Sequence, residues 1–227
     1  MVRQAFDREL QRLQDEVTGL GSMVGEALIQ SIEQLKKRDF AGSRLLIAGD
    51  RAINEKRFEI EEEVLTLIAT QQPMAGDMRL LGAILEIVTE LERMGDYAKG
   101  IARINLMIGE QPLVKPLIDL PLMAECARDM LHDALHAFRT ADIELARSIP
   151  CRDDEIDHLY EQIYRELLTY IMEDRSVIEQ SNLLMWAAHN LERTGDRVIN
   201  LCERVVYMVT GELEELNCDA SGLESLT

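Results

Sequence analysis

Residues 91–96 read LERMGD and residues 191–196 read LERTGD, so five of six positions are identical at a separation of 100 residues. A second match lies upstream, where DRAIN at residues 50–54 aligns with DDEID at residues 153–157, at an offset of 103. Matches at nearly constant spacing indicate that the chain is a tandem duplication. An internal repeat of this kind determines the architecture before any local detail does.

Helical periodicity runs through both halves of the chain. From Phe6 to Leu35, apolar residues recur at intervals of three and four, which is typical of an amphipathic helix. The pattern predicts further helices at about residues 40–72, 75–109, 122–139, 142–173 and 176–210. No stretch alternates as a strand would, and long helices joined by short turns lie antiparallel. We therefore predict an all-α fold, a tandem repeat of two three-helix bundles with six long antiparallel helices.

Prolines mark the boundary between the two repeats. Three of the five prolines fall within residues 110–121, as expected of a linker. We place the first repeat at residues 1–110 and the second at residues 121–211. Residues 212–227 carry acids and no bases, and they are predicted to form an acidic, disordered tail.

A helix breaker precedes the upstream acidic stretch in each repeat, Gly49 in the first and Pro150 in the second. A proline inside a helix removes one hydrogen bond and bends the helix axis. We interpret the breakers as a kink in the second helix of each bundle. A helix that ends and restarts at this point is the alternative.

The net charge of −18 excludes several classes of partner. Nucleic acid and anionic lipid both attract Lys and Arg, so neither is expected to bind this chain. No run approaches the roughly 20 apolar residues that a membrane-spanning helix needs, and the N-terminus lacks the apolar core of a signal peptide. We therefore expect a cytoplasmic protein that does not insert into membranes. An acidic surface favours cations or basic partner surfaces.

The four cysteines, Cys126, Cys151, Cys202 and Cys218, are scattered without a CxxC pair. We interpret them as small neutral side chains, in preference to a zinc site or a disulfide framework.

Paired acids at positions i and i+4 are the candidate functional residues. Glu92 with Asp96, and Glu192 with Asp196, place two carboxylates on one face of the third helix of each bundle. On the second helix, Asp153 and Asp157 form such a pair, and Asp50 and Asn54 are its counterpart. Antiparallel neighbouring helices can bring these pairs face to face, and converging oxygen donors suit Mg²⁺, Mn²⁺, Ca²⁺ or iron. We predict one metal site in each repeat, weaker in the first because Asn54 carries no charge.

The repeated glycine in this motif also needs a reason. Gly95 and Gly195 lie inside predicted helices, where each costs about 1 kcal/mol relative to Ala. Close approach of another helix is one explanation, and room for something bound between the acids is another. A solvated acidic face with no ligand remains the alternative to a metal site.

Several stretches resemble the PhoU family of phosphate-uptake regulators. The resemblance rests on QQPMAGDMRL at residues 71–80, LERMGDYA at residues 91–98, the second LERTGD and the DRAIN stretch. It covers nearly the whole chain, although Ser181-Asn182-Leu183 lacks the pattern of Pro73, Asp77 and Arg79, which leaves a shared role for Arg79 open there.

The resemblance implies a cytoplasmic negative regulator of phosphate uptake and phosphate-starvation signalling. Its partners would be the ATPase of a Pst-type phosphate ABC transporter and a sensor histidine kinase, between which it acts as an adaptor. It also implies a homodimer, and metal ions such as iron, manganese or magnesium on acid-x-x-x-Asp motifs. These motifs fall on Asp50 with Asn54, Glu92 with Asp96, Asp153 with Asp157, and Glu192 with Asp196.

Two other functions stay open on the residues alone. One is a metal-dependent enzyme on a helical scaffold, either a di-iron oxidase or a phosphohydrolase. The other is a coiled-coil scaffold whose acids only keep the surface soluble. The chain has no GxSxG motif, no glycine-rich phosphate loop and no Cys/His pair with supporting spacing, so we do not expect an enzyme. The regulatory role is what the resemblance implies.

Overall fold

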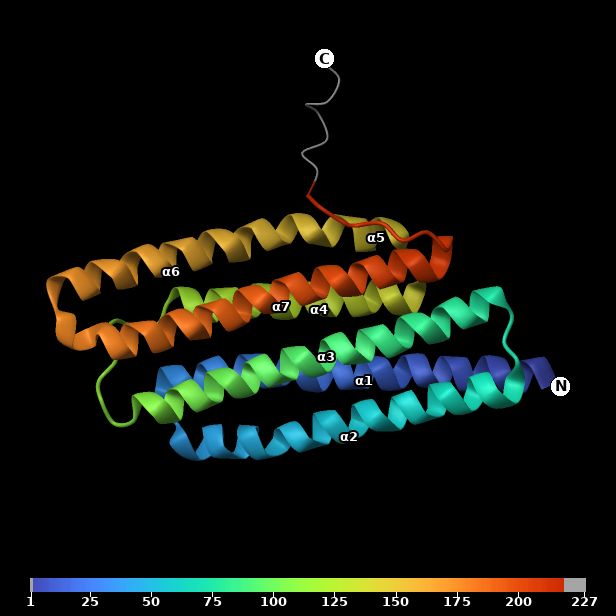
Figure 1. Ribbon diagram of the computed structural model, residues 1–227, viewed down its shortest axis with the longest axis horizontal. Coiled ribbons are helices and arrows are strands. Elements are labelled where there is room, and N and C mark those ends of the chain that lie inside the picture. Colours follow the sequence, from blue (N-terminus) through green and yellow to red (C-terminus); the bar gives the residue numbers. More distant parts are fainter. Residues whose placement is uncertain (1, 219–227) are drawn as a thin grey trace, which may run out of the picture.

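Helices make up the regular structure of the computed structural model, which describes residues 2–218, and no strand occurs in this range (Figure 1). The long helices are α1 (Val2–Lys37), α2 (Phe40–Gln71), α3 (Ala75–Ile108), α4 (Asp119–Thr140), α6 (Asp153–Glu173) and α7 (Ile178–Thr210). The short ones are α5 (Ile143–Ser148) and the 3₁₀ turns η1 (Ile149–Arg152) and η2 (Arg175–Val177). The predicted all-α fold of two three-helix bundles is confirmed. None of the described helices combines the length and apolar character needed to cross a bilayer.

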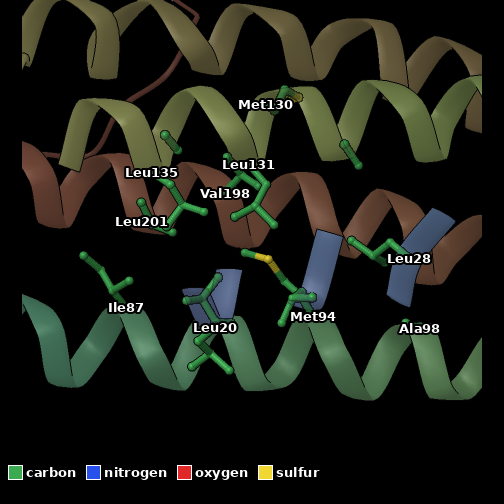
Figure 2. Close-up of a cluster of buried hydrophobic side chains, with 14 of the residues drawn as sticks. Leu20, Leu28, Ile87, Met94, Ala98, Met130, Leu131, Leu135, Val198 and Leu201 are labelled. Carbon is green, nitrogen blue, oxygen red and sulfur yellow. The ribbon is translucent and has the colours of Figure 1, made fainter. Parts of the chain in front are cut away.

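The two bundles share one hydrophobic core. Helices α3 and α7 run side by side through the middle of the molecule, α1 packs against α4, and α2 and α6 lie at the two outer edges (Figure 1). Figure 2 shows buried side chains from four helices meeting in this core, among them Leu20, Leu28, Ile87, Met94, Ala98, Met130, Leu131, Leu135, Val198 and Leu201. The duplication therefore produces one continuous core, to which both repeats contribute apolar residues.

Spacing of apolar residues explains why α1 forms and which face it buries. Leu13, Val17, Leu20, Val24 and Leu28 are fully buried, at steps of three and four residues. On a helix these steps place the side chains on one stripe that faces the core. The charged residues between them remain on the outer side.

Both repeats begin their second helix with the same turn. Arg38 and Ala141 adopt a left-handed backbone conformation, with φ of 57° and 54°. Each is followed by an aspartate that caps the next helix: Asp39 accepts from the Gly42 N–H at 2.8 Å, and Asp142 accepts from the Leu145 N–H at 3.0 Å. Such caps typically contribute about 1 kcal/mol. The duplication thus extends to the turn that starts the second helix of each repeat.

The two helix-breaking residues, Gly49 and Pro150, have different effects on the second helix of their repeats. Helix α2 continues through Gly49 without interruption. In the second repeat, the helix predicted at residues 142–173 ends at Ser148, passes through η1 around Pro150, and restarts as α6 at Asp153. The alternative of a helix that ends and restarts is therefore correct for the second repeat, because proline lacks the N–H that a continuous helix needs.

Arg79 connects the two repeats. Its Nε donates to the backbone oxygen of Met208 at 3.4 Å, and its side chain lies 3.5 Å from a Cβ built on Gly211. Gly211 has a φ of +81° and ends α7. A guanidinium at the C-terminal end of a helix interacts favourably with its last carbonyl groups. Arg79 therefore has a structural role, in capping α7.

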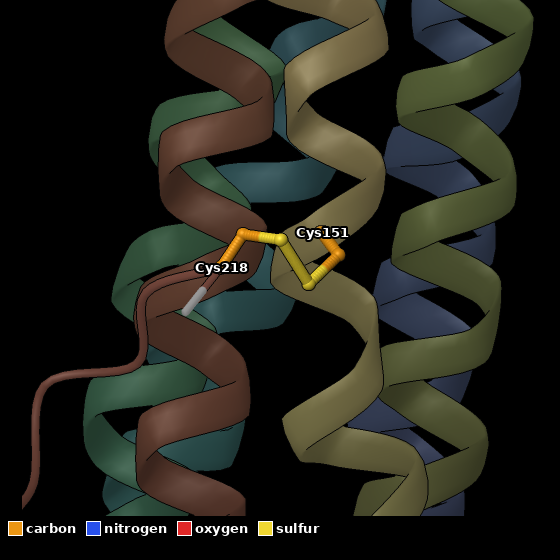
Figure 3. The surroundings of a disulfide bond; sticks show 2 residues. All are labelled: Cys151 and Cys218. Carbon is orange, nitrogen blue, oxygen red and sulfur yellow. A yellow bond between two sulfur atoms is a disulfide. The ribbon is translucent and has the colours of Figure 1, made fainter. Parts of the chain in front are cut away.

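The C-terminal segment contradicts the interpretation of the cysteines. Cys151 and Cys218 form a disulfide across a sequence separation of 67 residues, whereas the sequence analysis expected no disulfide (Figure 3). Residues 212–218 of the predicted tail lie against the second bundle. Leu216 packs on the core and donates its N–H to Glu203 at 3.1 Å, and Arg147 pairs with Glu214 at 2.8 Å. Residues 219–227 of the predicted tail fall outside the described range.

The disulfide predicts a definite thiol count. Oxidised protein should show two free thiols, because only Cys126 and Cys202 are unpaired in the described chain. Cys202 is fully buried, so native protein should react at Cys126 alone and at both on unfolding. Reduction should add two thiols and lower the free energy of unfolding by about 2–4 kcal/mol. Thiol titration with and without denaturant, and urea unfolding with and without reductant, measure both effects. Four thiols in unreduced, unfolded protein would contradict the disulfide.

Candidate functional site

The four predicted acids of the second repeat lie together between α6 and α7. We call Asp153, Asp157, Glu192 and Asp196 the second acidic cluster. Burial is the main cause that raises the pKa of the Asp153 carboxyl to about 7, and the negative charges of the other three members raise it as well. Burial and a neighbouring carboxylate likewise raise the pKa of Asp157 and of Glu192, with Asp196 as the neighbour in both cases. The predicted face-to-face arrangement is therefore present in the fold.

The repeated glycine allows the helices to approach at this point. A Cβ on Gly195 would overlap Oδ1 of Asp153, so only glycine leaves room for that carboxylate against α7. In the first repeat, a Cβ on Gly95 would lie 3.1 Å from Cδ1 of Ile53. Close helix approach thus explains the glycine in both copies.

Negative charge in the second acidic cluster is poorly compensated. Oδ1 of Asp153 and Oε2 of Glu192 are buried and accept no hydrogen bond from any described residue. His189 Nδ1 lies 3.2 Å from Oε2 of Glu192, and Arg193 Nε lies 3.8 Å from a carboxylate oxygen of Asp196. Neither contact has the geometry of a hydrogen bond. Oδ1 of Asp153 and Oε2 of Glu192 therefore retain acceptor capacity that the fold does not use.

The first acidic cluster consists of Asp50, Asn54, Glu92 and Asp96. Lys99 fills it: its Nζ lies 2.5 Å from Oδ2 of Asp50 and 3.2 Å from Oδ1 of Asp96. Asn54 donates its amide to the same Asp50 oxygen at 3.2 Å, so it is the amide nitrogen that points into the cluster.

Glu92 has a cationic partner of its own. Arg57 Nη1 lies 3.6 Å from its carboxylate. Burial, followed by the charge of Asp96, still raises the pKa of Glu92, while Arg57 lowers it. With Lys99 and Arg57 in place, the first cluster contains its own counter-ions.

Both cations are missing from the second repeat. At the offsets of the matched stretches, Ile199 stands where the first repeat has Lys99, and Tyr160 stands where it has Arg57. The sequence analysis missed Lys99 and Arg57 as members of the site. A position-by-position comparison of the two repeats would have shown that each position has a cation in the first repeat and none in the second. The duplicated clusters have therefore diverged electrostatically: the first has Lys99 and Arg57 as counter-ions, and the second has only the contacts of His189 and Arg193.

The donor set of the second cluster suits a hard cation. Carboxylate oxygens are the preferred ligands of Mg²⁺, Mn²⁺ and Ca²⁺, and Oδ1 of Asp153 and Oε2 of Glu192 accept no hydrogen bond from a described residue. As the side chains stand, no group of three or more His, Cys, Asp or Glu residues among those described is placed to hold a metal ion. A cation would therefore have to draw the carboxylates of this cluster together. The first cluster does not fit a metal unless Lys99 moves away.

Stability should depend on pH through Asp153. Its pKa is raised on folding, so its charge costs nothing below about pH 4 and destabilises the fold increasingly as pH rises towards about 7. In the presence of a chelator, native protein should lose on the order of 2–4 kcal/mol between pH 4 and pH 8 relative to Asp153→Asn. Urea unfolding at several pH values measures the difference, and Glu110→Gln, at an exposed position of the linker, is the control. A difference that does not vary with pH would contradict the assignment.

Comparison with known proteins gives a consistent result. The model of the PhoU domain matches residues 17–104 and again residues 120–205. A phosphate-specific transport system accessory protein PhoU homolog from Clostridium acetobutylicum is 36% identical over 221 residues, which cover 96% of this chain and all of the relative. The accessory protein PhoU of Escherichia coli K12 is 36% identical over 207 residues, covering 91% of this chain and 86% of that protein.

A solved structure extends the similarity to three dimensions. The crystal structure of the phosphate transport system regulatory protein PhoU from Streptococcus pneumoniae superposes with a TM-score of 0.86 at 34% identity, covering 93% of this chain and all of the other. The predicted resemblance is confirmed by a domain match in each half, by relatives aligned along nearly the whole length and by a shared fold. The chain belongs to the PhoU family.

Proposed function

We propose that this protein is a non-enzymatic accessory regulator of a phosphate-specific transport system. The observation that carries the proposal is its similarity, over more than nine-tenths of the chain, to proteins named as accessory or regulatory components of such systems. In the finer form of the proposal, it is a cytoplasmic homodimer that represses phosphate uptake and phosphate-starvation signalling. It does so as an adaptor between the transporter ATPase and a sensor histidine kinase.

Cation binding at the second acidic cluster is the second part of the proposal. Four acids face one another there without an internal lysine, whereas Lys99 occupies the first cluster. A divalent or trivalent ion would take the place that an ammonium group takes in the first repeat. It would neutralise the repulsion between carboxylates and stabilise the packing of α6 on α7.

A single substitution tests this equivalence. Ile199→Lys places an amine where the first repeat carries Lys99, so it should stabilise metal-free protein and abolish its response to metal. With Mn²⁺ at a hundredfold excess over its Kd, native protein should gain about 2.7 kcal/mol, a rise in Tm of roughly 5–10 °C. Thr169→Lys, an equal charge change at an exposed position of α6, should leave the response intact.

Thermal melts in chelator and in Mn²⁺ measure the response, and elemental analysis measures the metal bound per chain. Fe³⁺ and Mg²⁺ replace Mn²⁺ in parallel melts. An equal rise in Tm for native protein and Ile199→Lys would show that the second acidic cluster is not the metal site.

A cellular experiment tests the regulatory role. Deleting the gene from its host should switch on phosphate-starvation genes in phosphate-rich medium, and restoring the native gene should silence them. Ile199→Lys should restore silencing less well if the cation is needed, while Thr169→Lys should restore it fully. Reporter expression measures the outcome.

Two outcomes contradict the regulatory proposal. Unchanged starvation-gene expression after deletion removes the regulatory role. Turnover of a phosphate ester by the purified protein, abolished by Asp153→Asn with Asp196→Asn, favours the metal-dependent enzyme instead.

A further inference from the structure

An exposed group of aromatic side chains borders the second acidic cluster. We call Tyr160, Tyr164, Trp186 and His189 the aromatic strip. Trp186, the only tryptophan in the chain, is 63% exposed, and Tyr164 is 44% exposed. The ring centroid of His189 lies 6.3 Å from that of Tyr160 and 6.1 Å from that of Trp186. The two tyrosines also line a surface depression of about 370 Å³.

Of these side chains, Trp186 and Tyr164 are exposed, whereas Tyr160 is partly buried and packs against the core. Trp186 projects outward from α7, while Leu184, Ala187 and Ala188 beside it are buried in the core. The equivalent positions of the first repeat hold no aromatic residue and are, in order, Arg57, Glu61, Glu86 and Thr89. These positions of the first repeat form ion pairs instead: Arg57 pairs with Glu61 at 2.7 Å, and Glu86 pairs with Arg204 of α7 at 3.0 Å. The aromatic strip is therefore specific to the second repeat, and its Trp186 and Tyr164 side chains are exposed.

Negative charge adjoins the strip. His189 Nδ1 is 3.2 Å from Oε2 of Glu192, and the charge of Glu192, after burial, raises the pKa of Tyr160. Arg165, the cation that lines the depression, is paired with Glu161 at 3.1 Å. Aromatic faces beside carboxylates form a site for a cationic group. A guanidinium stacks on the rings and pairs with the acids at the same time.

The net charge of the chain indicates which kind of partner would bind the aromatic strip. With a net charge of −18, the chain repels nucleic acid and anionic lipid. A second copy carries the same charge, and its own acidic cluster would be repelled from this one. A partner protein with an arginine-bearing basic segment satisfies both the aromatic and the acidic parts of the surface.

We propose that the aromatic strip and the adjoining acids bind an arginine-containing basic segment of a partner protein, with Trp186 as the central contact. This inference goes beyond the proposed function, since it names the contact surface and the chemistry of its occupant. Binding at this surface requires neither metal nor phosphate. A negative peptide-binding assay would therefore contradict this inference alone, whereas a negative cellular experiment would contradict the proposed regulatory function.

Short peptides test the proposal with purified protein in chelator at physiological salt. Hexa-arginine should bind and change the fluorescence of Trp186, whereas hexa-citrulline, which has the same shape without charge, should not. Trp186→Ala should weaken hexa-arginine binding at least about fivefold by calorimetry. Phe58→Ala, which removes an aromatic ring 58% exposed on α2, should leave binding unchanged. Asp196→Asn should weaken binding more than Glu110→Gln, an exposed acid in the linker.

Three results would each overturn the proposal. The first is equal affinity of native protein and Trp186→Ala for hexa-arginine. The second is equal binding of hexa-citrulline and hexa-arginine. The third is a native dimer, seen by light scattering, that Trp186→Ala converts to a monomer, because the surface would then be covered by a second copy of the chain.

Discussion

Packing of α3 against α7 is the interaction on which the rest of the molecule depends. Apolar residues from both helices meet in the shared core, and close approach continues along the contact, where a Cβ on Gly100 would lie 2.9 Å from Asn190 Nδ2. Arg197 reaches across to pair with Glu90 at 3.2 Å. Because α3 and α7 also carry the repeated LER-x-GD motif, this packing holds the third-helix acids of both repeats on a rigid support. The two acidic clusters then lie towards opposite edges of the molecule, where α2 and α6 complete them (Figure 1).

Like-charge repulsion is handled differently in the two clusters. In the first, one lysine bridges carboxylates from two helices, so the fold supplies the counter-charge itself. In the second, an isoleucine occupies the equivalent position and the pKa of Asp153 rises to about 7. Buried, unpaired charge is costly and persists where something outside the chain relieves it. The duplicated scaffold thus combines one cluster with lysine and arginine counter-ions of its own and one cluster that lacks them.

The repeat, the helices and the acid pairs were predictable because each depends on local periodicity. Steps of three and four mark the buried stripes, and positions i and i+4 place Glu192 and Asp196 on one face. Contacts between distant residues were not predictable in this way. The bridge from Lys99 to Asp50 depends on the relative rotation of α2 and α3, and the link from Cys151 to Cys218 depends on the path of the C-terminal segment. The aromatic strip combines α6 with α7, and only their register places Tyr160 beside His189.

The break at Pro150 has a consequence for the site itself. Because α6 begins anew after η1, Asp153 lies in its first turn together with Asp154 and Glu155. Carboxylates in a first turn interact favourably with the positive end of the helix dipole, typically by 0.3–1 kcal/mol each. Asp50, its counterpart, lies in the interior of the unbroken α2, where the helix end offers no such compensation, and it pairs with Lys99 instead. The break at Pro150 therefore gives Asp153 a partial compensation that Asp50 lacks, but one too small to offset the burial and the neighbouring carboxylates that raise its pKa to about 7.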